Sequence, residues 1–511
     1  MNVAAATAPA DGSFFRKAGP LVLARLVAAG ITFVIPLVLA RAMALDEYGT
    51  YKQLFLIAQT LFYILPFGVT QSLYFFVPRT DHARPWVVQT LLFTLGTGLL
   101  AAGLIYALGE PVASALQNPR LLDYRWELAV YTAGLVAASP LEVLLTSQGR
   151  TRHSALMYLL SDGLRAGAMV VPVLLGYGLK GAMTCMAGFG CVRMIAAWLT
   201  MALGTRGPWF ERGLGWRQLA YAAPFGAAML LSIPQQYAHQ YAVGAQVTPE
   251  LFAIYAVGCF QLPLVDLLYS PTSEVLMVQV GQLDREGRLR EAIDAFKAAS
   301  ARLAYAFLPM AAFLFVAAPE FIAALFGRKF LGAVPIFRVS VLAVAGSIFP
   351  MDGLLRARNE TRFLFVSYLV KTVVTVPLVY FGVTRLGMLG GILSWAIAEL
   401  IGKLTLLSRV PRALGFTRED GHLVSRVIRV LPLKSLGKAL LSAVGAAVAV
   451  ALLRGVEPST DALPDGSLWR MVPLALVSLL YLVGYLACLR VTGVRPLAML
   501  SQLRRRPAQP A

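Results

Sequence analysis

Long apolar stretches alternate with short polar ones along almost the whole chain. A helix needs about 20 mainly apolar residues to cross a bilayer, and on that measure the pattern predicts about 14 transmembrane helices. They cover residues 19–40, 51–77, 86–108, 126–146, 154–176, 181–203, 218–245, 251–281, 303–326, 334–355, 363–383, 388–408, 436–454 and 469–490. No connection between them is long enough to fold as a separate soluble domain. The predicted fold is therefore an all-α polytopic membrane protein.

Composition supports this fold class. Of the 511 residues, 58% are hydrophobic and 14% are charged, whereas soluble domains carry about 25% charged residues. The first 18 residues lack a short apolar core with a small-residue cleavage site, so we expect the first helix to be retained. The four cysteines lie in apolar runs without zinc-ligand spacing, and we interpret them as packing residues rather than a metal site.

Charge is spread over many loops. The net charge of +19 is distributed between apolar segments rather than gathered in a groove, which argues against nucleic acid as a partner. Cytoplasmic loops of membrane proteins are rich in Lys and Arg. If the N-terminus is cytoplasmic, most of the 45 basic residues fall on the cytoplasmic side, while the outside loop "VEPSTDALPDGS" is acidic. Both termini are therefore predicted to be cytoplasmic.

An internal repeat links the two halves of the chain. The stretch after Arg150 has a counterpart 210 residues later, in which Thr151 and Arg152 match Thr361 and Arg362. The order of loop, helix, glycine turn and helix is repeated as well. Because six helices separate the copies, both enter the membrane in the same direction. Such parallel repeats are a common transporter plan, with the site between the halves.

The repeat and the loops together predict seven segments. These are a cytoplasmic N-terminal segment at 1–18, a first six-helix bundle at 19–203, a cytoplasmic linker at 204–217, a second six-helix bundle at 218–408, a basic cytoplasmic loop at 409–435, two additional helices at 436–490 and a basic cytoplasmic tail at 491–511.

Two stretches carry a resemblance to a known family. "LARAMALDEYGTYKQLFLIAQ" has an arginine after the first helix, a short linker, then an acid, an aromatic residue and glycine. In "APEFIAALFGRKFLGAVPIF" a helix ends in Phe-Gly, a basic-aromatic turn follows, and Ala-x-Pro opens the next helix. Both resemble polysaccharide-export proteins of the multidrug/oligosaccharidyl-lipid/polysaccharide exporter superfamily. The resemblance covers the first twelve helices and implies a MATE-like pair of bundles; the last two helices resemble the additional pair of peptidoglycan-precursor flippases.

The resemblance implies a Wzx-like flippase that turns a polyprenyl-diphosphate-linked oligosaccharide between leaflets of the bacterial cytoplasmic (inner) membrane. It would act as a monomer without a cofactor, with a proton or sodium gradient as candidate driving force and a polysaccharide polymerase complex as candidate partner. Two alternatives stay open. An exporter of organic cations would need a lumen dominated by carboxylates, and a membrane-embedded polysaccharide-synthesis enzyme would need a catalytic acid pair or a sizeable outside loop. We predict no catalytic residue, and the chain contains no GxxxxGK[ST] nucleotide motif.

Cations within the predicted helices are the first candidate site residues. A charge at the bilayer centre costs about 2.5 to 3.5 kcal/mol, so those far from a helix end call for an explanation. They are candidates for a cationic cavity that binds the substrate's diphosphate or acidic sugars, namely Arg25, Arg165, Arg193 and Lys371. The alternative is that each is neutralised by an intramembrane acid, as Asp162 could do for Arg165 from three residues earlier.

Acids and a polar stripe complete the candidates. Asp266, together with Asp162, is the candidate for binding a coupling proton or sodium ion. Glu399 precedes Lys403 by four residues, which predicts a pair on one helix face, and Lys403 lies near enough to a helix end to reach the interface. Polar and aromatic side chains repeat every four residues in "SIPQQYAHQYAVG", and they either line a sugar path or join helices: Gln235, Gln236, Tyr237, His239, Gln240 and Tyr241.

Overall fold

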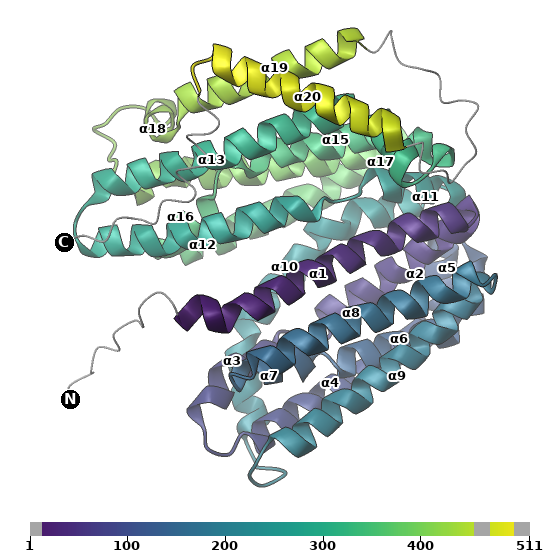
Figure 1. Cartoon of the computed structure of the whole chain (residues 1–511). Helices are drawn as coiled ribbons and strands as arrows, with labels where there is room; N and C mark the ends of the chain where they lie inside the picture. The colour runs from purple at the N-terminus through teal and green to yellow at the C-terminus, as the bar shows by residue number, and fades with distance from the viewer. Residues whose placement is uncertain (1–12, 454–470, 495–511) are drawn as a thin grey trace, which may run out of the picture. The chain divides into compact units, whose positions relative to one another are not determined.

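The computed structural model describes residues 13–453 and 471–494 of the chain. These residues form helices and short connections, without a strand among them (Figure 1). They divide into two compact units: unit 1 runs to Tyr237 and includes Gly244–Ala253, and unit 2 comprises Ala238–Val243 and the residues from Ile254 onward. Each unit is described by itself.

Unit 1 contains the first nine helices and most of the tenth. These are α1 (Ser13–Ala42), α2 (Leu45–Ile64), α3 (Leu73–Phe76), α4 (Arg84–Ala107), α5 (Gly109–Ala115), α6 (Arg125–Ala137), α7 (Pro140–Ser147), α8 (Thr151–Leu174), α9 (Gly178–Gly204) and α10 (Leu214–Gly244), with short 3-10 helices η1 (Val69–Ser72), η2 (Val77–Arg79) and η3 (Pro119–Tyr124).

Unit 2 contains the remaining helices, and α10 and α11 each contribute residues to both units. These are α11 (Pro249–Gly258), α12 (Pro263–Arg285), α13 (Leu289–Val316), α14 (Ala318–Leu325), α15 (Val334–Ala345), α16 (Met351–Ala357), α17 (Thr361–Ala413), α18 (Leu423–Val430), α19 (Leu433–Leu453) and α20 (Met471–Val491), with η4 (Arg328–Ala333) and η5 (Gly346–Ile348).

Five of the predicted helices are broken, and each break lies beside a proline. Proline has no N–H to donate, and its ring clashes with the carbonyl four residues earlier, so a helix often stops there. The prolines at the breaks are Pro66, Pro140, Pro263, Pro319 and Pro350. Two of these breaks bend their spans strongly, by 45° between Leu45–Ile64 and Val69–Arg79 and by 41° between α11 and α12.

The order of helices repeats at the offset seen in the sequence. Helix α8 begins at Thr151, and α17 begins at Thr361, 210 residues later. The short helices α7 and α16 precede them at the same offset within a residue or two, and the long helices α4 and α13 stand at corresponding places before those. The order of these elements agrees with the internal repeat seen in the sequence.

Helix α17 is a hairpin of two arms. The predicted helices at 363–383 and 388–408 both fall within it, and the chain turns at Gly387, whose φ of 56° and ψ of −138° are not helical. The arms approach closely enough for the Ser394 hydroxyl to donate to the Leu378 carbonyl at 2.9 Å. Glycine suits this turn because its backbone conformation is one that L side chains rarely adopt.

Glycines also allow close packing in unit 1. A Cβ placed on Gly134 of α6 would lie 2.4 Å from the carbonyl carbon of Gly190 in α9, and one on Gly98 of α4 would lie 2.7 Å from the Ala133 oxygen. Small residues let helix backbones approach in membranes, where packing rather than the hydrophobic effect drives association. Helix α6 is therefore held between α4 and α9.

In unit 2, α19 and α20 pack side by side against α13 (Figure 1). Their shared core is formed by small residues of α19 and by aromatic residues of α20, and Tyr485 donates to the Tyr305 carbonyl at 3.1 Å. The two additional helices thus belong to the unit that contains the second repeat.

Helix length and hydropathy indicate a multi-pass membrane protein. The described residues contain nine helices long and apolar enough to cross a membrane, or eleven if each strongly bent pair is one span. Helix α17 is one of the nine and holds two predicted crossings. The total of fourteen and the cytoplasmic placement of the termini stay predictions.

Candidate functional site

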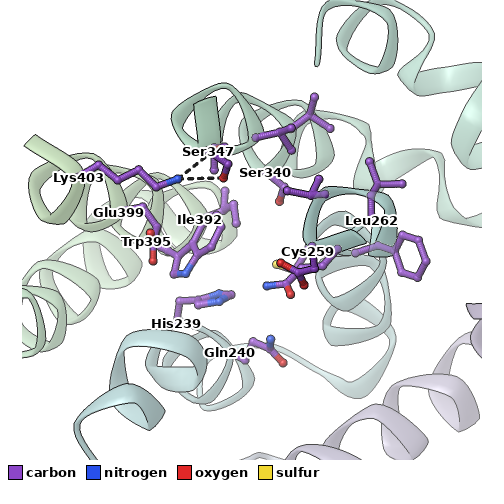
Figure 2. A pocket seen from close by; sticks show the side chains of 17 residues that line it. His239, Gln240, Cys259, Leu262, Ser340, Ser347, Ile392, Trp395, Glu399 and Lys403 are labelled. Atoms are coloured by element: carbon purple, nitrogen blue, oxygen red, sulfur yellow. Dashed lines mark hydrogen bonds between the residues drawn. The ribbon is translucent and has the colours of Figure 1, made fainter. Parts of the chain in front are cut away.

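A polar cavity of about 280 Å³ lies within unit 2 (Figure 2). Its walls come from the end of α10, the break between α11 and α12, helix α15 with η5, and the second arm of α17. Carboxylate, ammonium, amide, hydroxyl and indole groups line it beside apolar side chains. A pocket with a few polar groups on a largely apolar wall is the usual form of a ligand site.

The second arm of α17 gives the cavity one whole wall. Ile392, Trp395, Glu399 and Lys403 follow one another at intervals of three or four residues, so all four lie on the same helical face. Figure 2 shows them rising along this arm, with Lys403 reaching across to Ser347.

The opposite wall contains non-helical backbone. Residues 259–262 lie between α11 and α12 and line the cavity. The Gly258 carbonyl at the end of α11 accepts a hydrogen bond of 2.9 Å from the Ser340 hydroxyl. Irregular backbone at membrane depth is tolerated only where protein buries it or where it lines a polar cavity. Asp266, in the first turn of α12, also lines this cavity.

His239 is fixed in the cavity wall by two aromatic neighbours. Its Nδ1 lies 2.7 Å from the hydroxyl of Tyr255, which is fully buried, and its ring lies 5.7 Å from that of Trp395. Gln240 follows it on α10 and also lines the cavity (Figure 2).

Two lysines of this region lie near the carboxylate of Glu399. Lys371, from the first arm of α17, forms an ion pair with Glu399 on the second arm. Lys403 donates instead to the Ser347 hydroxyl at 3.2 Å and to the Ala343 carbonyl at 3.5 Å. Glu399 and Lys403 lie on one helical face, as predicted, and interact electrostatically, but the salt bridge of Glu399 is with Lys371, which the hairpin brings to it.

Glycines make room for both lysines. A Cβ on Gly346 would lie 3.0 Å from the Lys403 Nζ, and a Cβ on Gly402 would lie 2.9 Å from the Lys371 Cδ. Each lysine stem therefore runs directly over a glycine backbone.

A second cavity of about 240 Å³ shares Ser347, Glu399 and Lys403 with the first. Asp352 of α16 lies in its wall and accepts hydrogen bonds from the hydroxyls of Tyr269 and Ser273. Arg356, four residues after Asp352, forms a salt bridge with the same carboxylate at 2.7 Å.

Unit 1 contains two further ion pairs in its spanning helices. Arg193 of α9 lies 2.5 Å from Glu142 of α7, and Arg165 of α8 lies 2.7 Å from Asp162. Arg165 also donates to the Thr32 hydroxyl at 2.6 Å, which joins α8 to α1. The Nε atoms of both arginines are buried and have no hydrogen-bond partner among the described residues.

A family model described as "Polysaccharide biosynthesis protein" matches residues 38–335, more than half of the chain. The chain belongs to the polysaccharide biosynthesis protein family. A search of curated proteins found no match.

Solved structures of transporters share the fold of this family member. The lipid II flippase MurJ in an inward closed conformation matches with a TM-score of 0.68 and 12% identity, covering 92% of this chain and 98% of the flippase. An inward-facing multidrug resistance MATE transporter of the MOP superfamily matches with a TM-score of 0.58 and 14% identity, over 75% and 94%. A MOP superfamily transporter from Pyrococcus furiosus, described as having a binding pocket of reverse polarity, matches with a TM-score of 0.52 and 16% identity, over 79% of this chain and 96% of the transporter.

In this family member, three of the four predicted cations have acid partners. Each of these three is in a salt bridge: Arg165, Arg193 and Lys371. Their geometry agrees with the alternative given above, in which an intramembrane acid neutralises each cation. Arg25 falls in α1, and its side chain lies outside the described residues. Their roles in substrate binding, and those of Asp162 and Asp266 in ion coupling, stay predictions.

The predicted polar stripe divides between the two units. Gln235, Gln236 and Tyr237 belong to unit 1, where the Tyr237 ring stacks at 6.5 Å on Tyr63. His239, Gln240 and Tyr241 belong to unit 2, and the first two of these line the larger cavity.

Sequence reasoning missed Trp395, Ser340 and Ser347, and it placed Lys403 at the interface rather than in a cavity wall. A signal for this wall was present, because Ile392, Trp395, Glu399 and Lys403 keep helical spacing along one face.

Proposed function

We propose that the protein is a flippase that translocates a polyprenyl-diphosphate-linked oligosaccharide across the bacterial cytoplasmic membrane by alternating access. The substrate would be the repeat unit of an O-antigen, a capsule or an exopolysaccharide. The observation that carries this proposal is the family match over residues 38–335. It is supported by the similarity of the fold to a lipid II flippase, 98% of which is covered.

The polar walls of unit 2 supply what such a reaction needs. A glycan headgroup cannot cross hydrocarbon without losing its hydrogen bonds to water, which costs several kcal/mol per polar group. Amide, hydroxyl and ammonium groups in spanning segments can replace part of that hydration, and the Trp395 ring offers an apolar face to a pyranose.

The ion pairs define how the candidate cations would act. Arg165 and Arg193 already have carboxylate partners. We expect each to bind a substrate phosphate through guanidinium N–H groups that its acid leaves available. Asp266 is the candidate for coupling to a proton or sodium gradient.

A multidrug or organic cation exporter is the second candidate, because a MATE transporter shares the fold with a TM-score of 0.58. Both cavities of unit 2 contain carboxylates as well as lysines. Glu399 and Asp352 are in salt bridges, whereas Lys403 is in none among the described residues, and we therefore prefer an anionic substrate. If this protein transported labelled organic cations in proteoliposomes at a rate similar to that of a known exporter, the preference would be reversed.

Deletion of the gene, followed by analysis of carrier lipids, tests the proposal. We expect undecaprenyl-linked repeat units to accumulate in the inner leaflet, and a plasmid copy of the wild-type gene to clear them. Unchanged carrier lipids in the deleted strain would overturn the proposal. A Gly437→Ala copy is a suitable positive control, since a Cβ there meets open space.

A further inference from the structure

Lys403 differs from the paired cations of the spanning helices. Arg165, Arg193 and Lys371 are each within salt-bridge distance of a carboxylate. Lys403 is only partly exposed, and its ammonium group donates hydrogen bonds to a hydroxyl and a carbonyl, both uncharged. The ammonium group of Lys403 is therefore in no salt bridge among the described residues, and Glu399, the acid that acts on it electrostatically, is paired with Lys371.

Neighbouring residues hold the side chain of Lys403 in position. Its stem runs over Gly346, where any larger residue would press on the ammonium group. Ser347 then holds the Nζ at 3.2 Å, in the part of the wall common to both cavities. A long side chain held in this way loses little further freedom when an anion binds to it.

The neighbours of Lys403 suit a sugar ring. Trp395 lies two turns earlier on the same face and is backed by His239, which is itself fixed by Tyr255. The apolar face of an indole accepts the C–H face of a pyranose, while amides such as Gln240 bind its hydroxyls. The volume of about 280 Å³ is at the lower limit of sites for drug-sized ligands, which leaves room for roughly one ring.

The charges of the wall favour a single negative charge over a diphosphate. Asp266 and Glu399 also line the cavity, and Glu399 is already occupied by Lys371. Asp266 would therefore repel a multiply charged diphosphate more strongly than a single carboxylate, and Lys403 can pair with one substrate carboxylate because it is in no salt bridge among the described residues.

We propose that this cavity is a subsite for one acidic sugar ring of the glycan, in which Lys403 pairs with the sugar carboxylate and Trp395 packs against the ring. This assignment rests on the proposed function and makes the protein selective for glycans that contain a uronic acid or a similar acidic sugar.

Binding of two matched glycosides to the purified protein tests the subsite directly. Octyl glucuronide and octyl glucoside differ only in the carboxylate, and calorimetry gives the affinity for each. We expect wild-type protein to prefer the glucuronide by about tenfold to a hundredfold, as expected for a hydrogen bond to a charged group. Lys403→Gln should remove the preference and leave glucoside binding unchanged, and Lys403→Arg should restore part of it. Equal affinity of the wild-type protein for both glycosides would overturn the proposal.

Trp395→Ala separates the ring contact from the charge contact. We expect Trp395→Ala to lower the affinity for both glycosides by a similar factor, because both contain the sugar ring that packs against Trp395. An effect on the glucuronide alone would contradict the place assigned to Trp395.

Flipping in proteoliposomes connects the subsite with transport. The probes are polyprenyl-diphosphate-linked disaccharides that end in glucose or in glucuronic acid. If the subsite is correct, Lys403→Gln slows only the acidic disaccharide. Equal slowing of both would place Lys403 at the diphosphate and overturn the subsite. If the wild-type protein flips neither probe, the proposed function fails, and the glycoside affinities still decide whether Lys403 binds an acidic sugar.

Discussion

The ion pair between Arg193 and Glu142 allows a quantitative test of unit 1. The two groups are 2.5 Å apart, and their side chains are 17% and 6% exposed. Glu142→Ala removes the carboxylate and leaves a guanidinium between α7 and α9 without its counter-charge. Arg193→Ala leaves the more deeply buried carboxylate in the same position.

The expected cost follows from the geometry. At an effective dielectric constant of about 20, two unit charges 2.5 Å apart attract by roughly 6 to 7 kcal/mol. Desolvation of both ions offsets much of this attraction, and removal of one partner from a buried pair costs about 3 to 5 kcal/mol. Because Arg193 is 17% exposed, we expect about 3 kcal/mol for Glu142→Ala and slightly more for Arg193→Ala.

Reversible unfolding in mixed detergent micelles measures these free energies. The double variant Glu142→Ala, Arg193→Ala should lose about 1 to 3 kcal/mol less than the sum of the single variants, because it leaves no buried charge unpaired. Additive effects would refute the ion pair. Export by the double variant then separates two roles of Arg193. Restored export means that it acts only through the pair, and lost export by a folded double variant present at the wild-type protein level means that it contacts substrate.

Two further predictions concern packing. Tyr255→Phe removes the partner of the His239 Nδ1 and should lower the free energy of unfolding by about 1 to 3 kcal/mol, the cost of a buried polar group left without its hydrogen bond; an unchanged value would refute the assigned contact. Gly134→Ala should cost at least about 1 to 3 kcal/mol, because its Cβ would meet the backbone of Gly190 at 2.4 Å. Gly188→Ala in α9, the helix of Gly190, meets nothing within 4 Å and serves as the control. Equal values for the two alanine variants would contradict the close crossing.

The places of the helices could be predicted because bilayer thickness imposes a length that apolar runs reveal directly. The positions at which these helices are interrupted could not be predicted from the sequence. Pro309 and Pro377 lie inside helices, whereas the chain breaks at Pro263 and Pro350. A proline removes one hydrogen bond in every case, and tertiary packing decides whether the helix continues past it.

In the candidate site, contacts between residues close in sequence could likewise be predicted, whereas contacts between distant residues could not. The pair of Asp162 with Arg165 was anticipated as an alternative because three residues on a helix place two side chains on one face. The partner of Lys371 lies 28 residues away on the other arm of α17, and no local spacing identifies it. The local rule instead predicted Glu399 with Lys403, since it could not account for a competing lysine from the other arm.

The hairpin of α17 also bears on how the protein enters the membrane. A lone lysine or glutamate in an inserting helix raises the free energy of insertion, by about 2.5 to 3.5 kcal/mol for lysine at the centre. The turn at Gly387 places Lys371 and Glu399 side by side within one hairpin. If the two arms insert together, the opposite charges enter as a neutral pair, so the hairpin can complete this ion pair before the part of unit 2 that follows α17 has been synthesised.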